Sequence, residues 1–335
     1  MRPLITPAAR RLWRDRETLQ LGRSPGRAVV LAGVDGVARA VLALLDGTRD
    51  RERLLTDADA LGSPPARTEQ VLALLEQAGL IDDAAGNRTA IAGRAERDRF
   101  APDLGSLRLV RGPQSDEAVR RRLAALVVVE GAGRVGATVA ALLAAAGVGA
   151  VEVVDDGITR PEDCGVGGLP PSAVGTPRGE AARTLLPGEP SARTRLPELV
   201  VLTPAPGVPL GEAPRLVPHL LAEVRGEVGV VGPLVSPGSS ACLRCLDLTR
   251  ADRDPDWPLI ALQLGEPVRG VQPCDSGLAL AVAAQTALQA LAFLDAASLP
   301  ATVGGTLELV LPDWRWRRRS WQLHPDCGCG WRDTG

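Results

Sequence analysis

One stretch, residues 126–156, constrains the fold more than any other part of the chain. It begins with the apolar, largely β-branched run Leu126–Val129, which is typical of a buried strand. Residues 131–136 (GAGRVG) then form a complete G-x-G-x-x-G pattern, and an alanine-rich helical segment follows. A second apolar run, Ala150–Val154, ends at Asp155. Strand, glycine turn, helix, second strand and terminal acid together predict a Rossmann-type β-α-β unit.

The same residues have defined roles if the unit binds a nucleotide. Gly131 permits the tight turn after the strand, and Gly133 lets backbone N–H groups approach a phosphate. Gly136 lets the helix pack close to the strand, and an acid at Asp155 can accept hydrogen bonds from ribose hydroxyls. With Arg134 in the same loop, the candidate nucleotide-binding residues are Gly131, Gly133, Arg134, Gly136 and Asp155.

Composition narrows the classes of function. The length of 335 residues favours two domains, and the formal net charge of −2 gives no general attraction to nucleic acid or to a membrane. Every basic residue is arginine, so no lysine can act as a phosphate clamp. No signal peptide follows Met1, and the longest apolar run, Leu278–Leu294, is interrupted by Gln285 and Gln289. We expect a soluble, cytoplasmic protein that binds neither nucleic acid nor membrane.

The first part of the chain, residues 1–90, is predicted to be a domain of its own. Two strand-like runs precede three helical patterns, in the order 18–22, 28–31, 35–45, 50–60 and 68–78. A hairpin followed by three short helices predicts a small winged-helix-like α+β domain. A plain scaffold or dimerisation module is the alternative, and DNA binding is not favoured because no helix has a concentrated basic face. The polar residues 91–106 are interpreted as a linker.

The remaining residues, 107–335, are predicted to form an α/β domain with a Rossmann-like sheet. We expect a strand at Leu107–Val110, a helix at Ser115–Ala124, and the longest helix at Ser276–Ala297. Further strands are predicted at 198–202, 219–224, 228–235, 307–311 and 314–321. The last two would form a terminal hairpin, in which arginines alternate with tryptophans. Such alternation usually means that one face is buried and the other solvated.

Two pairs of cysteines predict a metal site. Cys242 and Cys245 have the spacing of a metal-binding turn, and Cys327 and Cys329 form a tighter pair far along the chain. In a reducing cytosol this pattern favours a tetrahedral structural zinc site over disulfides. His324 is the alternative to Cys329 as fourth ligand, and a redox dithiol is the alternative to a metal.

Three further side chains have a functional and a structural interpretation. Cys274, before the longest helix, is either a reactive thiol at a helix N-terminus or a buried cysteine, and the second is favoured. Cys164, in a Gly- and Pro-rich segment, has the same two interpretations. His219 begins an apolar strand and is interpreted as structural. The chain has two histidines, so acid–base catalysis by histidine is not favoured. No catalytic residue is assigned.

These motifs resemble a known family. Residues 107–335 resemble the ThiF/MoeB-like superfamily, the bacterial relatives of ubiquitin-activating enzymes, on the glycine motif, Cys242/Cys245 and the terminal cysteine pair. The resemblance implies a nucleotide-binding sheet, a four-cysteine zinc site and, by analogy, a homodimer. In element order, residues 1–90 resemble the PqqD-like element that binds leader peptides of ribosomally made natural products. The two together are similar to the partner protein of azoline-forming cyclodehydratases, whose ThiF-like part is commonly non-adenylating.

The sequence departs from adenylating members of that superfamily at three points. Residues 162–167 (EDCGVG) lack the phosphate-binding arginine of an Asn-x-x-Arg-Gln segment. The chain has no lysine, and residues 203–207 (TPAPG) lack the magnesium-binding carboxylate expected after a later strand. Arg160 and Arg178 are the candidate cationic substitutes. Because adenylation must neutralise the departing pyrophosphate, these losses point away from that reaction.

Two functional hypotheses follow. In the first, a zinc-stapled ThiF-like scaffold recognises a leader peptide through residues 1–90 and presents it to a partner modifying enzyme, without adenylating anything itself. In the second, the chain is an ATP-dependent adenylyltransferase that activates the C-terminus of a peptide or sulfur carrier. A nicotinamide-dependent oxidoreductase is less favoured, since no His or Lys is placed for hydride chemistry.

Overall fold

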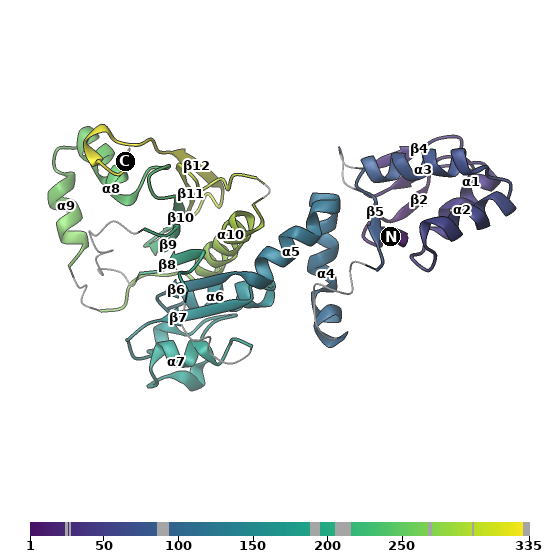
Figure 1. Ribbon diagram of the computed structural model, residues 1–335. Coiled ribbons are helices and arrows are strands. Elements are labelled where there is room, and N and C mark those ends of the chain that lie inside the picture. Colours follow the sequence, from purple (N-terminus) through teal and green to yellow (C-terminus); the bar gives the residue numbers. More distant parts are fainter. Residues whose placement is uncertain are drawn as a thin grey trace. The chain divides into compact units, whose positions relative to one another are not determined.

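The computed structural model describes residues 1–23, 26, 28–85, 94–187, 195–204, 216–266, 270–296 and 298–330. The chain divides into two compact units, Met1–Arg120 and Arg121–Gly335 (Figure 1). The division falls inside a helix, α5, rather than at residue 106, where the sequence suggested the end of a linker.

The first unit contains the predicted hairpin and the three predicted helices. Its antiparallel sheet has the order β2-β3-β4, and a second pair of strands joins β1 to β5. The strands are β1 (Pro3–Ile5), β2 (Arg11–Trp13), β3 (Leu19–Leu21), β4 (Val29–Leu31) and β5 (Ile81–Asp83). The helices are α1 (Gly36–Leu44), α2 (Arg51–Ala60) and α3 (Pro65–Gln77). Ser24 and Pro25, in the predicted turn between β3 and β4, lie outside the described residues.

Caps and apolar spacing explain why these helices form where they do. Asp35 and Asp50 each accept a backbone N–H from three residues ahead, at 2.7 and 2.9 Å, and so begin α1 and α2. Pro65 occupies the first turn of α3, where its missing N–H costs nothing. One face of each element then meets in a single core, formed by Leu19, Leu21, Leu42, Leu45, Leu54, Leu72 and Leu75.

The region between the predicted domains is largely helical. Helix α4 (Arg94–Arg111) covers most of the predicted linker, and the predicted strand Leu107–Val110 is wrong because these residues are its last turns. Leu107 is buried whereas Val110 is 60% exposed, so only one side of this apolar run is buried. Helix α5 (Ser115–Ala124) confirms the helix predicted at those residues.

The second unit is built on a mixed seven-stranded sheet in the order β12-β11-β10-β9-β8-β6-β7. Strands β7, β6, β8 and β9 are parallel to one another, and β10, β11 and β12 continue the sheet antiparallel. Their bounds are β6 (Leu126–Glu130), β7 (Ala150–Val154), β8 (Leu199–Leu202), β9 (His219–Arg225), β10 (Val228–Val235), β11 (Gly305–Val310) and β12 (Trp316–Ser320). All seven were expected from the sequence at these places.

The described part of the second unit has five helices besides this sheet. They are α6 (Gly136–Ala145), α7 (Arg178–Arg183), α8 (Leu243–Arg253), α9 (Trp257–Leu264) and α10 (Ser276–Asp295). The sequence favours a short helix at 181–186, which overlaps α7, whereas α8 and α9 were not predicted. Short 3-10 turns occur at Gly112–Gln114, Pro161–Asp163, Pro171–Ala173 and Pro325–Cys327. Helices α6 and α10 pack against each other, and α10 also packs against β9 and β10. By length and composition α10 could cross a membrane, with a mean hydropathy of 1.7, yet 44% of that window is buried in the structure.

The end of the sheet differs from the prediction in one respect. We expected β12 to bury one face, but every residue of the strand is exposed. It is an edge strand, and its arginines make contacts beside the sheet: Arg318 donates to the carbonyl oxygen of Ala301 at 2.7 Å, and Arg317 pairs with Asp313. Charged edge strands of this kind protect a sheet from pairing with another chain.

Candidate functional sites

The glycine loop after β6 has the strained turn that its sequence predicts. Gly131 has φ of +104°, and a Cβ at this position would lie 2.0 Å from the carbonyl oxygen of Thr203. A Cβ on Gly136 would lie 2.0 Å from the carbonyl oxygen of Gly131. Both positions therefore require glycine, whereas a Cβ on Gly133 would meet nothing closer than 3.8 Å. A Cβ at Gly133 would make only an ordinary van der Waals contact, with Oδ1 of Asp163.

Thr203, which follows β8, packs against this turn. Its backbone N–H donates to the carbonyl oxygen of Glu130 at 2.8 Å, and its hydroxyl donates to that of Gly131 at 2.9 Å. The turn is thus fastened to the end of a neighbouring strand. Residues Ala205–Gly207, part of the segment without a metal-binding carboxylate, lie outside the described residues.

Asp155, the predicted ribose acid, is held by groups of the protein itself. Its Oδ2 accepts the backbone N–H of Ala132 at 2.7 Å, and its Oδ1 accepts that of Gly157 at 2.8 Å. The Nε and Nη2 atoms of Arg178 both lie 3.0 Å from Oδ1. The Asp155 side chain is 7% exposed. Since a carboxylate offers about four lone-pair sites, little capacity is left for a ribose diol.

Arg178 reaches Asp155 from the start of α7 and touches a second acid. Its Nη1 lies 3.3 Å from both carboxylate oxygens of Asp163, and the Arg178 side chain is 19% exposed. One guanidinium therefore bridges two largely buried carboxylates, and we call this group of three residues, Asp155, Asp163 and Arg178, the Arg178 clamp. The sequence named Arg178 only as a substitute phosphate ligand. Nothing in the spacing of these residues signalled the clamp.

Arg134, the basic residue of the loop, is used to join two segments. Its Nε donates to the carbonyl oxygen of Glu162 at 2.6 Å, and its Nη1 donates to the carbonyl oxygen of Cys274 at 2.8 Å and to the hydroxyl of Ser276 at 3.1 Å. The loop after β7 is thereby tied to the start of α10. In this arrangement the guanidinium is directed at protein carbonyls rather than at a phosphate.

The two isolated cysteines lie near this loop without features of a nucleophile. Burial raises the pKa of the Cys274 thiol, and the nearby Arg134 only partly opposes the shift. The helix that follows is capped by Asp275, which accepts the N–H of Leu278 at 2.9 Å. The Sγ of Cys164 lies 3.4 Å from the carbonyl oxygen of Pro170. These contacts agree with the structural interpretation of both residues.

His219 also has a structural environment. It is 5% exposed, and its Nδ1 lies 3.0 Å from the carbonyl oxygen of Val217.

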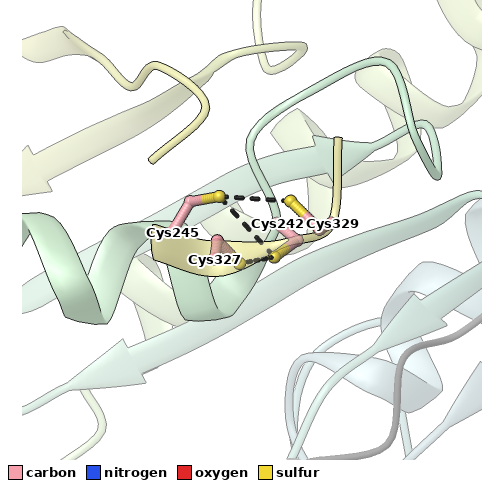
Figure 2. A group of neighbouring side chains, drawn as sticks. All are labelled: Cys242, Cys245, Cys327 and Cys329. Carbon is pink, nitrogen blue, oxygen red and sulfur yellow. Dashed lines mark hydrogen bonds between the residues drawn. The ribbon is translucent and has the colours of Figure 1, made fainter. Parts of the chain in front are cut away.

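The four paired cysteines come together at the start of α8. The Sγ of Cys242 lies 3.8 Å from that of Cys245 and 3.4 Å from that of Cys327, and Cys245 lies 3.3 Å from Cys329 (Figure 2). All four sulfur atoms lie within 4.8 Å of one another, and none is in a disulfide. A tetrahedral site with metal–sulfur bonds of 2.3 Å needs sulfur atoms about 3.8 Å apart. The cluster could hold one metal ion.

His324 is not part of that sulfur cluster. Its Nε2 lies 2.9 Å from a carboxylate oxygen of Asp252, and its Nδ1 accepts the backbone N–H of Asp326 at 3.1 Å. Its own backbone N–H lies 3.4 Å from the Sγ of Cys245. Both ring nitrogens are engaged elsewhere, so the geometry favours Cys329 over His324 as the fourth ligand.

The thiols differ in their readiness to ionise. Burial opposes ionisation of Cys245, but hydrogen bonds from the backbone N–H groups of His324 and Cys242 and from neighbouring thiols outweigh it and lower its pKa. Burial and the hydrogen bond with Cys242 raise the pKa of Cys327 to about 11, and burial also raises the pKa of Cys329. Four crowded thiols resist shared ionisation unless a cation is present.

The cluster fastens the end of the hairpin to α8. Trp321, which follows β12, is 5% exposed and packs with Ala241, Leu246 and the four cysteines. Its indole N–H donates to the hydroxyl of Thr306 in β11 at 3.0 Å. The tail thus has both an apolar and a sulfur anchor.

Comparison with known proteins identifies the fold. Neither a protein-family model nor a curated protein matches the sequence. Among solved structures, Escherichia coli (E. coli) MccB with AMPCPP and MccA aligns with a TM-score of 0.71 and 15% identity, over 98% of this chain and 99% of that one. The microcin C7 biosynthetic enzyme MccB with N-formylated MccA gives 0.70 and 15%, over 99% and 100%. PaaA gives 0.66 and 16%, over 94% and 99%. The chain therefore has the fold of MccB along nearly its whole length.

Proposed function

We propose that this chain is a ThiF-like scaffold that recognises a leader peptide and presents it to a partner enzyme during peptide modification, without adenylation activity of its own. The fold supports a role in peptide modification, because MccB is named as a microcin biosynthetic enzyme and is seen in complex with MccA. The Arg178 clamp is the observation that supports the non-adenylating part.

We assign peptide recognition to the edge of β4 that pairs with no strand in the described part of the chain. In the ladder between β2 and β3, the backbone N–H of Gly22 donates to the carbonyl oxygen of Arg10, and the N–H of Arg14 donates to that of Thr18. Because hydrogen-bonded pairs alternate along an antiparallel ladder, the N–H and C=O of Gln20 point to β2. The backbone groups of Leu19 and Leu21 then point to β4, where they face Leu31 and Val29. The N–H and C=O of Val30 consequently point to the open edge. This edge can accept an added strand.

We propose that β4 and α3 together offer an apolar surface to the peptide. Val30 is 43% exposed, while Val29 and Leu31 are partly buried against the core. Val71 of α3 packs against the same core, and Leu74 of α3 is 58% exposed. The proposed recognition element is therefore winged-helix-like and PqqD-like in function, with β4 giving backbone hydrogen bonds and α3 giving side-chain contacts.

The lack of adenylation rests on charge. A nucleophilic carboxylate attacking ATP must overcome the negative charge of the departing pyrophosphate, which Mg²⁺ and cationic side chains normally offset. Here Arg178 is neutralised by Asp155 and Asp163, and Arg134 donates to carbonyl oxygens. No lysine exists in the chain. Because this chain is similar to the partner protein of azoline-forming cyclodehydratases, we propose that its partner is a cyclodehydratase-type enzyme that carries out the ATP-dependent step.

The four-cysteine cluster is proposed to hold zinc in a structural role. Four thiolates in tetrahedral array leave no coordination position for a substrate. We also propose a cytoplasmic location, because a reducing compartment keeps these thiols available for metal.

The peptide-binding proposal is tested at Val30. Peptides selected from a display library on the whole chain are measured by calorimetry against wild type, Val30→Pro and Val30→Thr. Proline removes the outward N–H at an edge position that tolerates it, so we expect at least a tenfold weaker affinity, while threonine keeps the N–H and stays within about threefold. Equal affinities in all three proteins would show that β4 is not the binding edge.

The second candidate function is an ATP-dependent adenylyltransferase. It is favoured by the intact glycine loop and by the likeness to MccB, which was also solved with ATP. It predicts exchange of labelled pyrophosphate into ATP when Mg²⁺ and a selected peptide are present. Pyrophosphate exchange above that of a Gly136→Ala control would contradict the scaffold proposal. If no exchange occurs and calorimetry detects no binding of ATP with Mg²⁺, the scaffold proposal is supported.

A further inference from the structure

Charge in the first unit is separated between its first strands and its helices. Residues 1–31, which contain β1 to β4, have seven arginines and two acidic residues, a formal charge of +5. Residues 32–85, which contain α1 to α3 and β5, have five arginines and ten acidic residues, a formal charge of −5. These 85 residues are therefore neutral in sum, but they combine a basic strand segment with an acidic helical segment.

The arginines of the helical segment are largely neutralised by acids of the same segment. Arg53, for example, lies 2.9 Å from Asp57. Four of the five arginines make such pairs: Arg49 with Asp46 and Asp57, Arg51 with Glu69 and Glu76, Arg53 with Asp57, and Arg67 with Asp35. These cations are already occupied by the protein's own carboxylates.

The arginines of the strand segment lack partners of that kind. Five of them are exposed, and we call this group the basic rim: Arg10, Arg11, Arg14, Arg16 and Arg23. Within the described part of the chain, none of the five pairs with a carboxylate, and Arg14 donates instead to the side-chain amide oxygen of Gln20 at 2.7 Å. A group of exposed cations without acidic partners attracts an anionic ligand.

The basic rim reaches both ends of β4, the strand to which we assign peptide recognition. At the end where β4 begins, Gly22 donates its backbone N–H to the carbonyl oxygen of Arg10 at 2.9 Å, and Arg23 follows Gly22 in the chain. At the other end, the N–H of Val34, just after β4, donates at 2.8 Å to a carbonyl oxygen in the turn at residues 14–18, which carries two more arginines of the rim. The three residues of β4 extend about 10 Å between these ends.

We propose that the peptide recognised by the first unit is acidic: an apolar segment pairs with β4, and carboxylates on both sides of that segment contact the basic rim. The inference rests on the proposed peptide recognition and adds the charge of the substrate to it. An extended peptide needs only about three or four residues to pass along β4, so its flanking residues come next to the two ends of the strand. Each exposed arginine–carboxylate pair changes an affinity by about 1.4- to 5-fold, so several such pairs are needed for selectivity.

A peptide fits this charge pattern better than a wider anion does. Neighbouring strands in a sheet are about 5 Å apart, so an added peptide can follow the strand segment alone. A nucleic acid or an anionic membrane spreads its negative charge over a broader surface. It would bring that charge close to the ten acidic residues of 32–85, which repel it over a Debye length of about 10 Å at 0.1 M salt.

Two synthetic peptides test the charge of the ligand. Both contain Val-Leu-Val-Leu flanked on each side by four residues, which are glutamates in one peptide and glutamines in the other, and both carry fluorescein for anisotropy measurements on the full chain. In about 10 mM salt we expect the glutamate peptide to bind at least about tenfold more tightly. In about 1 M salt the two affinities should agree within about twofold, because the Debye length falls from roughly 30 Å to roughly 3 Å. Equal affinities at low salt would overturn the proposal.

Paired substitutions locate the contact. The variant with Arg10→Gln and Arg23→Gln should bind the glutamate peptide at least about fivefold less tightly and the glutamine peptide within about twofold of wild type. The control carries Arg53→Gln and Arg120→Gln, which remove the same charge from side chains that are 70% and 62% exposed and that pair within their own helices. It should bind both peptides like wild type. Equal losses in the two variants would mean that only net charge matters, and would overturn the basic rim as the site.

Val30→Pro separates this inference from the proposed function. If Val30→Pro weakens binding of both peptides and the Arg10/Arg23 variant weakens neither, β4 is the peptide site and the acidic substrate is refuted. If the Arg10/Arg23 variant weakens the glutamate peptide and Val30→Pro does not, the basic rim is confirmed and the assignment of β4 is wrong. Failure of the glutamate peptide to bind, while display-selected peptides bind, would also refute the acidic substrate. Displacement of the glutamate peptide by an equal concentration of mixed-sequence DNA duplex, or by phosphatidylserine vesicles, would overturn a peptide as the occupant.

Discussion

Replacing Arg178 with alanine is the most informative single change in the second unit. The substitution removes two contacts of 3.0 Å to Asp155 and those of 3.3 Å to Asp163. A hydrogen bond to a charged group contributes about 1.5–3 kcal/mol, and removing one partner of a buried pair costs about 3–5 kcal/mol. Because the Arg178 side chain is 19% exposed, water can replace part of the loss. We expect a cost near the low end, about 3–4 kcal/mol.

Thermal unfolding measures this cost. For a unit of this size each kcal/mol lowers the Tm by roughly 2–4 °C, so Arg178→Ala should unfold about 6–16 °C below wild type. Arg160→Ala is the matched control from the loop before α7, since the Arg160 side chain is 72% exposed and its guanidinium lies 3.9 Å from Glu162. Its effect should be about 0–1 kcal/mol. If the two variants melted within about 2 °C of each other, the clamp would not be a structural element.

Three further predictions concern other parts of the molecule. Burial raises the pKa of Asp82 despite the opposing charge of Arg108, so the contribution of Asp82 to the free energy of unfolding should fall as pH rises from about 4 through that raised pKa. In urea titrations across this range, Asp82→Asn should lack that contribution, and a pH slope identical to that of wild type would contradict the assignment. Cys329→Ser should weaken zinc binding by roughly 10²–10³-fold, because four ligands would share a binding free energy of about 10–16 kcal/mol. Competition with a chelator measures this affinity, and Cys164→Ser, the control, should bind zinc like wild type. Equal affinities of the two variants would exclude Cys329 as a ligand. Gly136→Ala should lower the free energy of unfolding by more than about 3 kcal/mol, because its Cβ would lie 2.0 Å from a backbone oxygen. Gly133→Ala, the control, should lower it by under about 1 kcal/mol. Similar melting temperatures of the two variants would refute the close approach at Gly136.

Those parts of the fold that were predictable from the sequence have strong local signals. The β6-α6-β7 unit could be predicted because its glycines, apolar runs and terminal acid occur in a fixed order. The clustering of the four cysteines could be predicted because two closely spaced pairs are typical of residues that bind one metal ion. The choice between Cys329 and His324 could not, since it depends on Asp252 and Asp326 occupying the imidazole nitrogens.

Other elements depend on contacts that local sequence does not contain. The run Leu107–Val110 looks strand-like by itself, but helix formation is cooperative and the long stretch of helix-forming residues before it carries α4 through to Arg111. The Arg178 clamp joins residues 23 positions apart, brought together only when the loop after β7 folds back. The residues of α9, Trp257–Leu264, are nearly all apolar, so the segment has no amphipathic pattern that could have signalled a helix.

The fit between Thr203 and the glycine turn bears on how such motifs persist. Any side chain at Gly131 or Gly136 would collide with Thr203 or with the turn itself, whether or not a ligand is bound. Mutations at these glycines would thus be removed by their effect on folding, even in a lineage that had lost catalysis. Residues that serve only the reaction have no such protection and can drift. A chain of this architecture can therefore keep the outward signature of an ATP site long after selection for its chemistry has ended.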